Sequence, residues 1–266
     1  MRILVLIVAF LTGAEACAGG ALVAVGGGST LKSIRSRVVE LTGLEGGDVD
    51  VLVVPFASSA EDAGQGSVEM WLEDGVASCS ILEIDDREVA LRQIERADVI
   101  WMPGGSQNRL LERLQNADLV DAIVARHDDG AVVGGTSAGA AVQSPLMITG
   151  RAETESIEAG ATQVVDGLGL WPNAIVDQHF HARRRFNRLL SAVLAAPDHL
   201  GIGVDEATAA ILHDGAIEVV GRSSVMIIDA RRATIGSVEH GDPSSAAGVI
   251  VHVLTEGMTI EVDPTS

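Results

Sequence analysis

Tyrosine is absent from this chain of 266 residues, and aromatic residues make up only 3% of it. We therefore expect a hydrophobic core built from Val, Ile, Leu and Ala. Cysteine is also scarce, because Cys17 and Cys79 are the only two. If processing of the N-terminus removes Cys17, no disulfide can form within the chain.

Basic residues are in short supply as well. Lys32 is the only lysine, and 18 basic residues stand against 37 acidic ones, which gives a formal net charge of −19. Such a surface repels nucleic acid and anionic lipid, so a nucleic-acid-binding function is not expected. The chain is 47% hydrophobic, which is too apolar for a disordered protein.

The N-terminus resembles an export signal, which we assign to residues 1–18. A short positive start precedes an apolar run from Ile3 to Leu11, and Ala14-Glu15-Ala16 resembles a cleavage site. The apolar run is too short to span a membrane. A first β-strand is the alternative, but Ala21–Val25 already fills that role. We expect an extracellular or periplasmic protein, with lipid attachment at Cys17 left open.

Residues 21–266 are expected to form one α/β domain. Short apolar runs alternate with amphipathic stretches up to about residue 200, which is typical of a doubly wound, mostly parallel sheet flanked by helices. The expected buried strands are Ala21–Val25, Val51–Val54, Cys79–Ile84, Val99–Met102 and Ala131–Val133, and helices are expected near residues 31–41, 68–72, 89–96, 108–114 and 119–127. Additional C-terminal strands are expected at 207–212, 216–220, 225–228 and 249–253, with a hairpin turn at Asp214-Gly215 and a surface loop over 231–248.

Loops that follow the strands supply the candidate sites, because ligands bind at the carboxyl ends of strands in such sheets. Gly26-Gly27-Gly28 follows the first strand, and without a Walker lysine a tight packing turn is favoured over a phosphate-binding loop. Pro103–Gln107 follows another strand, and its glycines can bring backbone N–H groups close to a reacting carbonyl. Gln107 is a candidate for substrate contact, and a plain helix-start turn is the alternative.

The most informative loop is Gly134–Ala140, between an apolar strand and a following helix. Gly135–Gly139 fits the G-x-S-x-G pattern, which lifts a serine hydroxyl out of the backbone on a strained turn. Ser137 is therefore a candidate nucleophile. An idle serine in a glycine-rich turn is the alternative, because the pattern is short.

A nucleophilic serine needs a base, and His179 is the strongest candidate because it follows the apolar run Ala174–Val176, with His181 as its rival. The arginines that follow are Arg183, Arg184, Arg185 and Arg188. If residues 182–195 are helical, Arg184 and Arg188 lie one turn apart with Arg185 beside them. Beside a candidate base this run favours a carboxylate-binding pocket, and a solvated face paired with surplus acids is the alternative.

An acid that orients the histidine is expected at Asp205 or Glu206, which are adjacent carboxylates between apolar runs. Alternation along an extended segment would direct one of them into the site and the other out. The chain order of serine, histidine and acid differs from the serine, acid, histidine order of α/β-hydrolases. This order argues against an esterase or a lipase.

Together and in this order, these motifs resemble the cyanophycinase branch of the serine peptidases, which also include aspartyl dipeptidase and have a class I glutamine amidotransferase-like fold. The resemblance covers nearly the whole chain from about residue 21. It implies Ser137 as nucleophile, His179 as general base and Glu206 as the acid partner. It implies backbone N–H groups of Gly105 and Ala138 as the oxyanion hole, and a substrate pocket containing Gln107, Asp177, Gln178, Arg183, Arg185 and Arg188.

The activity implied by this resemblance is hydrolysis of cyanophycin, a polyaspartate whose side chains carry arginine, to β-Asp-Arg dipeptides. The resemblance implies no metal or organic cofactor. It does imply that the protein forms a homodimer. Cleavage of short Asp-containing peptides and non-catalytic binding on the same fold remain alternatives. Glutamine amidotransfer is not favoured, because that chemistry places a cysteine where this chain has Ser137, and Cys79 is no substitute.

Overall fold

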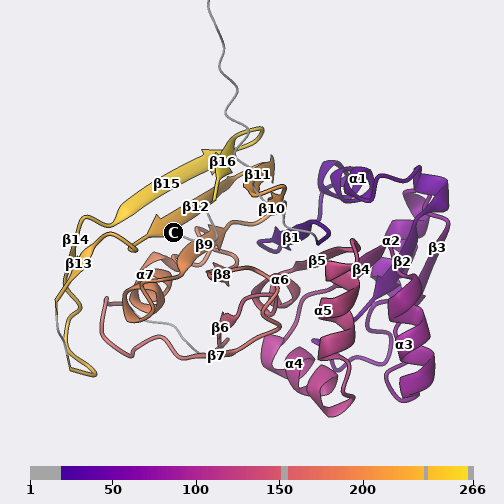
Figure 1. Cartoon of the computed structure of the whole chain (residues 1–266), viewed down its shortest axis with the longest axis horizontal. Helices are drawn as coiled ribbons and strands as arrows, with labels where there is room; N and C mark the ends of the chain where they lie inside the picture. Colours follow the sequence, from indigo (N-terminus) through magenta and orange to yellow (C-terminus); the bar gives the residue numbers. More distant parts are fainter. Residues whose placement is uncertain (1–18, 151–154, 237–238, 263–266) are drawn as a thin grey trace, which may run out of the picture.

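The computed structural model describes residues 19–150, 155–236 and 239–262 (Figure 1). The expected export signal and Cys17 lie outside the described residues. Two large β-sheets form the centre of the described part, one of eight strands and one of four. Within the described ranges, no helix is both long enough and apolar enough to cross a membrane.

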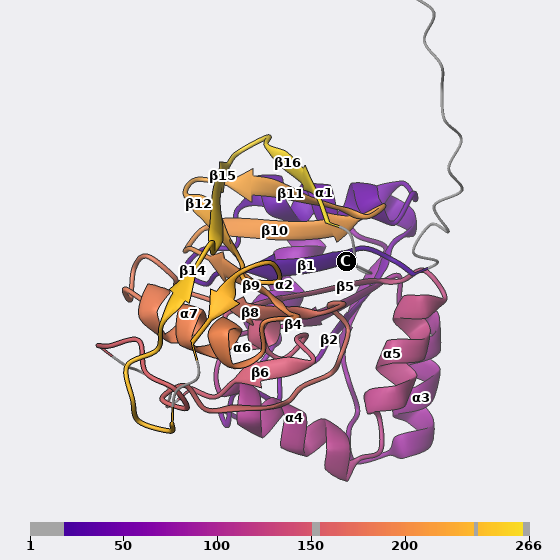
Figure 2. The same ribbon diagram turned by 60° about the vertical axis from the view of Figure 1, so that its left-hand side comes forward.

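The eight-stranded sheet has the order β16-β11-β10-β1-β5-β4-β2-β3. Its parallel part consists of β1 (Leu22–Val25), β2 (Asp50–Val53), β3 (Ser78–Ile81), β4 (Val99–Met102) and β5 (Val132–Thr136). Antiparallel strands β10 (Thr208–His213), β11 (Ala216–Gly221) and β16 (Thr259–Glu261) extend it beyond β1. Figure 2 shows β1 between β10 and β5. The prediction of a mostly parallel sheet with added C-terminal strands is confirmed.

Helices cover both faces of the parallel part, because successive strand residues point to opposite faces. The helices are α1 (Lys32–Leu41), α2 (Gln65–Glu73), α3 (Arg87–Arg96), α4 (Gln107–Asn116) and α5 (Val120–Asp128). Ile34 of α1 and Trp71 of α2 pack on one face with Val23, whereas Ile94 of α3 packs on the other face with Leu22. All five helices predicted from the sequence are therefore present.

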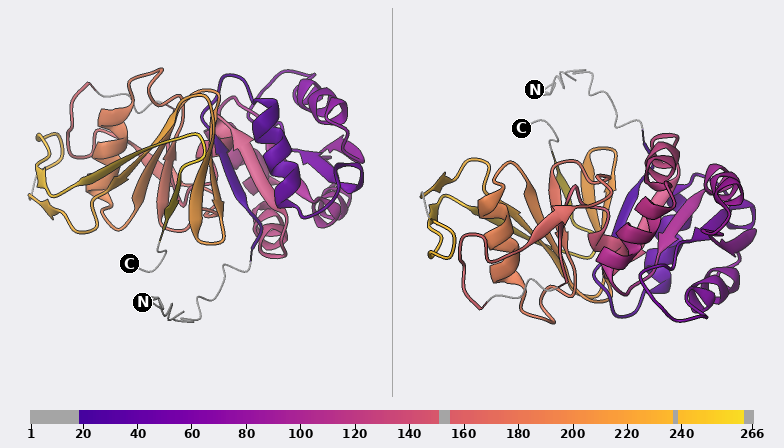
Figure 3. Two further views of the ribbon diagram at one scale, coloured as in Figure 1. Left: turned by 90° about the horizontal axis from the view of Figure 1, so that it is seen from above. Right: turned by 90° about the horizontal axis from the view of Figure 1, so that it is seen from below.

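The four-stranded sheet has the order β15-β12-β9-β8. Its strands are β8 (Ala174–Asp177), β9 (Leu200–Val204), β12 (Ser224–Asp229) and β15 (Ile250–Thr255). One face, which includes Val176 and Ile202, shares the core of the first sheet, and the other is covered by α7 (Phe186–Ala195). Figure 3 shows this sheet beside the first one, with α7 on its outer side. Apart from the short pair β13 and β14, the strands after residue 170 are thus divided between the two large sheets, which the sequence did not predict.

Short elements complete the fold: the 3-10 turn Gly46–Asp48, α6 (Ala138–Ala141), and the two-stranded pairs β6 (Leu146–Ile148) with β7 (Val164–Asp166) and β13 (Thr234–Ile235) with β14 (Ala246–Ala247). The last pair corrects the prediction of a surface loop over residues 231–248.

The expected buried strand Cys79–Ile84 was also partly wrong. Its counterpart β3 ends at Ile81 and exposes Ser78 and Ser80, because β3 is the last strand of its sheet.

The core also differs from the expected aliphatic one. Trp71, Trp101 and Trp171 are among the largest fully buried side chains. The rings of Trp71 and Trp101 meet edge to face with centroids 5.5 Å apart, an arrangement favoured by the ring quadrupoles. Few aromatic residues are present, but these three fill volume that aliphatic side chains alone were predicted to fill.

Candidate active site

Ser137 lies where β5 turns into the four-residue helix α6. Its backbone has φ 54° and ψ −109°, a sparsely populated conformation for a residue with a β-carbon. Gly139 permits this turn, because a β-carbon there would lie 1.8 Å from the carbonyl oxygen of Met102. The sequence therefore folds here into an elbow that presents the Ser137 hydroxyl at the carboxyl end of β5.

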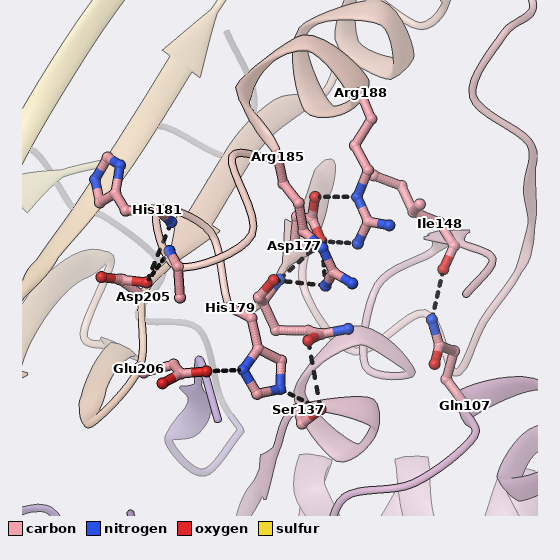
Figure 4. A network of polar contacts seen from close by, with 12 residues as sticks. Gln107, Ser137, Ile148, Asp177, His179, His181, Arg185, Arg188, Asp205 and Glu206 are labelled. Atoms are coloured by element: carbon pink, nitrogen blue, oxygen red, sulfur yellow. Dashed lines mark hydrogen bonds and ion pairs between the residues drawn. The ribbon is translucent and has the colours of Figure 1, made fainter. Parts of the chain in front are cut away.

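His179 approaches Ser137 from the second sheet, two residues after the end of β8 (Figure 4). Its Nε2 lies 3.0 Å from Oγ of Ser137, and its Nδ1 lies 2.5 Å from Oε1 of Glu206. Glu206 belongs to the crossover from β9 in one sheet to β10 in the other. Carboxylate, imidazole and hydroxyl thus form one continuous chain of hydrogen bonds. Such a chain can take the proton of the hydroxyl and stabilise the resulting imidazolium.

The two alternatives left open by the sequence lie elsewhere. His181 places its Nε2 3.0 Å from Oγ of Ser224, on the far side of the turn from Ser137. Asp205 accepts the backbone N–H groups of His181 and Ala182 at 3.1 and 3.0 Å. His179 and Glu206, rather than their neighbours, are therefore the residues brought to Ser137.

The environment of His179 favours its neutral form. Burial lowers the pKa of His179, and the positive charges of Arg183 and Arg185 act in the same direction. Glu206 opposes this through its hydrogen bond and negative charge. A lowered pKa leaves the imidazole able to accept a proton at a more acidic pH than an exposed histidine could.

The arginine run divides into a buried and an exposed part. Arg188 and Asp177 are 2% and 1% exposed and form a two-pronged ion pair, with Nε of Arg188 2.7 Å from Oδ2 of Asp177 and its Nη2 bonded to Oδ1. Arg185 is also buried and donates to the carbonyl of Gln178 at 2.7 Å. These contacts support the turn before His179. Arg188 therefore pairs with an acid, but it does so in the protein interior and not on the solvated face of the alternative interpretation.

The expected grouping of Arg184 with Arg188 was wrong. The helix expected from residue 182 begins only at Phe186, because the preceding residues form turns. Arg184 has φ 54°, which does not fit a right-handed helix, and its side chain is exposed together with that of Arg183.

Comparison with known proteins supports the same chemistry. Residues 22–220 match the sequence profile of Peptidase family S51. The chain belongs to this family. Cyanophycinase from Synechococcus elongatus is 36% identical over 254 residues, which covers 90% of this chain and 78% of that protein. By family, the chain is a serine-type peptidase similar to the cyanophycinases.

Two solved structures resemble this S51 peptidase in fold. The crystal structure of a peptidase from an acI-B1 Actinobacterium aligns with a TM-score of 0.60 at 23% identity, covering 91% of this chain and 97% of that one. A putative peptidase E from Listeria monocytogenes aligns with a TM-score of 0.56 at 17% identity, covering 77% and 100%.

Of the two expected oxyanion donors of this S51 peptidase, Ala138 directly follows Ser137, and Gly105 follows Gly104 in the loop that passes Ser137. Ala138 opens α6, and the first N–H groups of a helix have no partner within it. The Pro103–Gly105 loop passes the nucleophile closely, since a β-carbon on Gly104 would lie 3.4 Å from Cβ of Ser137. The role of Gly105 and Ala138 as donors stays a prediction.

The remaining predicted pocket residues of the S51 peptidase surround the nucleophile at different depths (Figure 4). Oε1 of Gln178 lies 3.3 Å from Oγ of Ser137. Gln107 is buried and donates to the carbonyl of Ile148 at 2.9 Å, which holds β6 beside the site. Within the described ranges, no group of three or more His, Cys, Asp and Glu side chains is placed to hold a metal ion.

Proposed function

We propose that this S51 peptidase hydrolyses cyanophycin to β-Asp-Arg dipeptides through an acyl-enzyme on Ser137. The observation that carries the proposal is the hydrogen-bonded chain of Ser137, His179 and Glu206 at one sheet edge. The similarity to cyanophycinases over most of the chain supports the choice of substrate.

Specific residues of this protein can carry out each step of the proposed reaction. His179 takes the Ser137 proton as the oxygen attacks the peptide carbonyl, and Glu206 keeps the imidazole oriented and favours its charged form. Backbone N–H groups of Gly105 and Ala138 stabilise the tetrahedral oxyanion, and losing one such donor costs on the order of 10²–10³ in rate. His179 then returns the proton to the leaving amine, and water hydrolyses the acyl-enzyme by the reverse sequence.

The charges around the site suit an aspartate-rich substrate. Arg183, whose charge acts on His179, and its neighbour Arg184 are both exposed on a protein whose formal net charge is −19. Arginine binds carboxylates in a planar, two-pronged geometry, so this local positive region favours aspartate carboxylates. The surrounding acidic surface favours the guanidinium groups of the same polymer.

The experiment is hydrolysis of cyanophycin granules beside α-linked Asp-X dipeptides and β-linked peptides, with Ser137→Ala as control. We expect release of β-Asp-Arg from granules, and a loss of at least about 10³-fold in Ser137→Ala. Cleavage of dipeptides alone would replace the substrate assignment by a dipeptidase activity. Undiminished activity in Ser137→Ala, or no labelling of Ser137 by a fluorophosphonate probe, would overturn the peptidase mechanism here.

We also propose export, on the sequence of residues 1–18. The test is cell fractionation of the native host followed by N-terminal sequencing of the mature protein. A mature chain that begins near Cys17 in the exported fraction is expected, and a cytoplasmic chain that retains residues 1–16 would contradict it.

A further inference from the structure

The turn after β1 contacts all three segments that carry the proposed catalytic residues. For Gly26-Gly27-Gly28 the sequence favours a tight packing turn over a phosphate-binding loop. In the structure this turn lies at the carboxyl end of β1, beside β5 on one side and β10 on the other. Ser137, His179 and Glu206 all reach this point from different parts of the chain.

Three consecutive carbonyl groups of this turn each hold one of those segments. The carbonyl of Val25 accepts the N–H of Ser137 at 2.9 Å, and that of Gly26 accepts the N–H of His179 at 2.6 Å. The carbonyl of Gly27 accepts the N–H of Ala207, the residue after Glu206, at 2.9 Å. Ser137, His179 and Ala207 all have positive φ, between 48° and 54°. The turn thus fixes the three strained backbone positions of the site relative to one another.

Gly27 also touches the base itself. A β-carbon on Gly27 would lie 2.2 Å from Cε1 and 2.5 Å from Nε2 of His179, so the imidazole rests directly on the bare backbone. Real β-carbons essentially never approach so closely, and the ring could not stay where it is beside any larger residue. The neighbouring Gly28 faces the acid, with a β-carbon there placed 3.2 Å from Cβ of Glu206.

We propose that Gly27 is a positioning residue that seats the His179 imidazole between Ser137 and Glu206. The inference rests on the proposed function, because it concerns how the base of that mechanism is held. Because Gly27 has no side chain, the His179 ring can lie directly against the backbone of the turn. The carbonyl groups of Val25, Gly26 and Gly27 accept hydrogen bonds that hold the backbone at Ser137, His179 and Ala207 around the ring. Gly27 takes no part in proton transfer.

The test compares Gly27→Ala with a matched control, Gly130→Ala. The two glycines have nearly identical φ angles, +106° and +105°, so the two substitutions are matched in the φ that a side chain disfavours. A β-carbon on Gly130 meets nothing within 4 Å, whereas one on Gly27 meets the imidazole. The readouts are kcat and KM, circular dichroism, and NMR titration of the Hε1 resonance of His179, assigned by its loss in His179→Gln.

We expect kcat to fall by about 10²-fold or more in Gly27→Ala with little change in KM, since displacing a catalytic group by about 1 Å costs this much. The pKa of His179 should rise towards its ordinary value, because burial now lowers it and the displaced ring is more exposed. Gly130→Ala should leave both quantities unchanged. Wild-type values in Gly27→Ala, or equal losses in the two variants, would overturn the proposal.

A second variant covers the case in which Gly27→Ala does not fold. Gly28→Ala is milder, because the nearest contact of its β-carbon would be 3.2 Å, to Cβ of Glu206, whereas that of Gly27→Ala would be 2.2 Å. Glu206 holds Nδ1 of His179 at 2.5 Å, so displacing Glu206 should shift the pKa of His179 and lower kcat less than Gly27→Ala does. An unchanged enzyme would show that this turn does not set the position of the ring and would overturn the proposal. If Ser137→Ala keeps full activity, the proposed function fails, and the NMR titration still decides whether Gly27 seats the ring.

Discussion

Asp205 and Glu206 are consecutive in the chain and hold the turn around His179 from two sides. Glu206 faces Nδ1 of the imidazole, whereas Asp205 accepts the N–H groups of His181 and Ala182 and the hydroxyl of Ser223. Burial by itself would raise the pKa of Asp205, but these hydrogen bonds outweigh it and the pKa is lowered. One carboxylate orients the ring and its neighbour anchors the backbone that carries it.

Asp205→Ala is therefore expected to reduce kcat while Asp205→Asn largely preserves it. The Asn side chain keeps a carbonyl oxygen that can accept the same two N–H groups, whereas Ala leaves them without this partner. Loss of such hydrogen bonds costs about 1–3 kcal/mol, or roughly 5- to 150-fold if it is expressed fully in kcat. Steady-state kinetics on both variants checks this. Equal damage in the two variants would instead assign the effect to the charge of Asp205.

Arg183 should shift the acidic limit of activity slightly, in addition to the larger effect of burial on His179. Its charge helps to lower the pKa of His179, so Arg183→Gln should raise that pKa and move the acid limb of the rate profile to higher pH. Because Arg183 is exposed, we expect only a few tenths of a pH unit, and less at high salt. The rate of Ser137 labelling by a fluorophosphonate against pH is the measurement, since it avoids changes in substrate binding. Arg184→Gln is the control, and an equal shift there would contradict the assignment to Arg183.

The sequence predicted the parallel strands, the flanking helices and the elbow at Ser137, because each depends on local patterns of apolar and small residues. The choice between His179 and His181, and between Asp205 and Glu206, depends on where β8 and β9 end in the second sheet. That sheet was not predicted, since its strands resemble those of the first one in composition.

The function of the Gly26–Gly28 turn could not be predicted for a related reason. Three glycines after a strand signal a tight turn, but the partner that requires the missing β-carbon is His179, some 150 residues later. The arginine run was misjudged because the positive φ of Arg184 breaks the helix before it can align Arg184 with Arg188. Tertiary contacts, not local propensity, decide both features.

Cys79 should be a poorly reactive thiol. Burial raises its pKa to about 12, so at pH 8 only about one thiol in 10⁴ is ionised, and the thiolate is the reactive form. Alkylation by iodoacetamide, followed by mass spectrometry of the peptide that contains Cys79, should be slow in the folded protein. It should become fast in guanidinium chloride. Rapid modification of the folded protein would contradict this burial and would reopen the question of a cysteine-dependent activity.

The Asp177–Arg188 ion pair should contribute more to stability than any exposed pair of this protein. Both side chains are almost fully buried, so Arg188→Met removes the nearer counter-charge of Asp177 and leaves it only Arg185, whose Nη1 lies 3.7 Å from Oδ1 of Asp177. Breaking a buried pair typically costs about 3–5 kcal/mol, and we expect a loss near the lower end of that range. The double variant Asp177→Asn/Arg188→Met removes both charges of this pair and keeps an amide oxygen for the N–H of Gln178. It should recover part of the loss, because Arg185 keeps its hydrogen bond to the carbonyl of Gln178 but loses its ion pair with Asp177. Urea unfolding provides the measurement, read as a shift in midpoint at constant m-value.

A matched exposed variant, Arg87→Met, breaks the pair with Asp118 and should cost less than about 1 kcal/mol. Should Arg188→Met prove no more damaging than Arg87→Met, the pair would contribute little to folding, and Arg188 would be better explained by substrate binding.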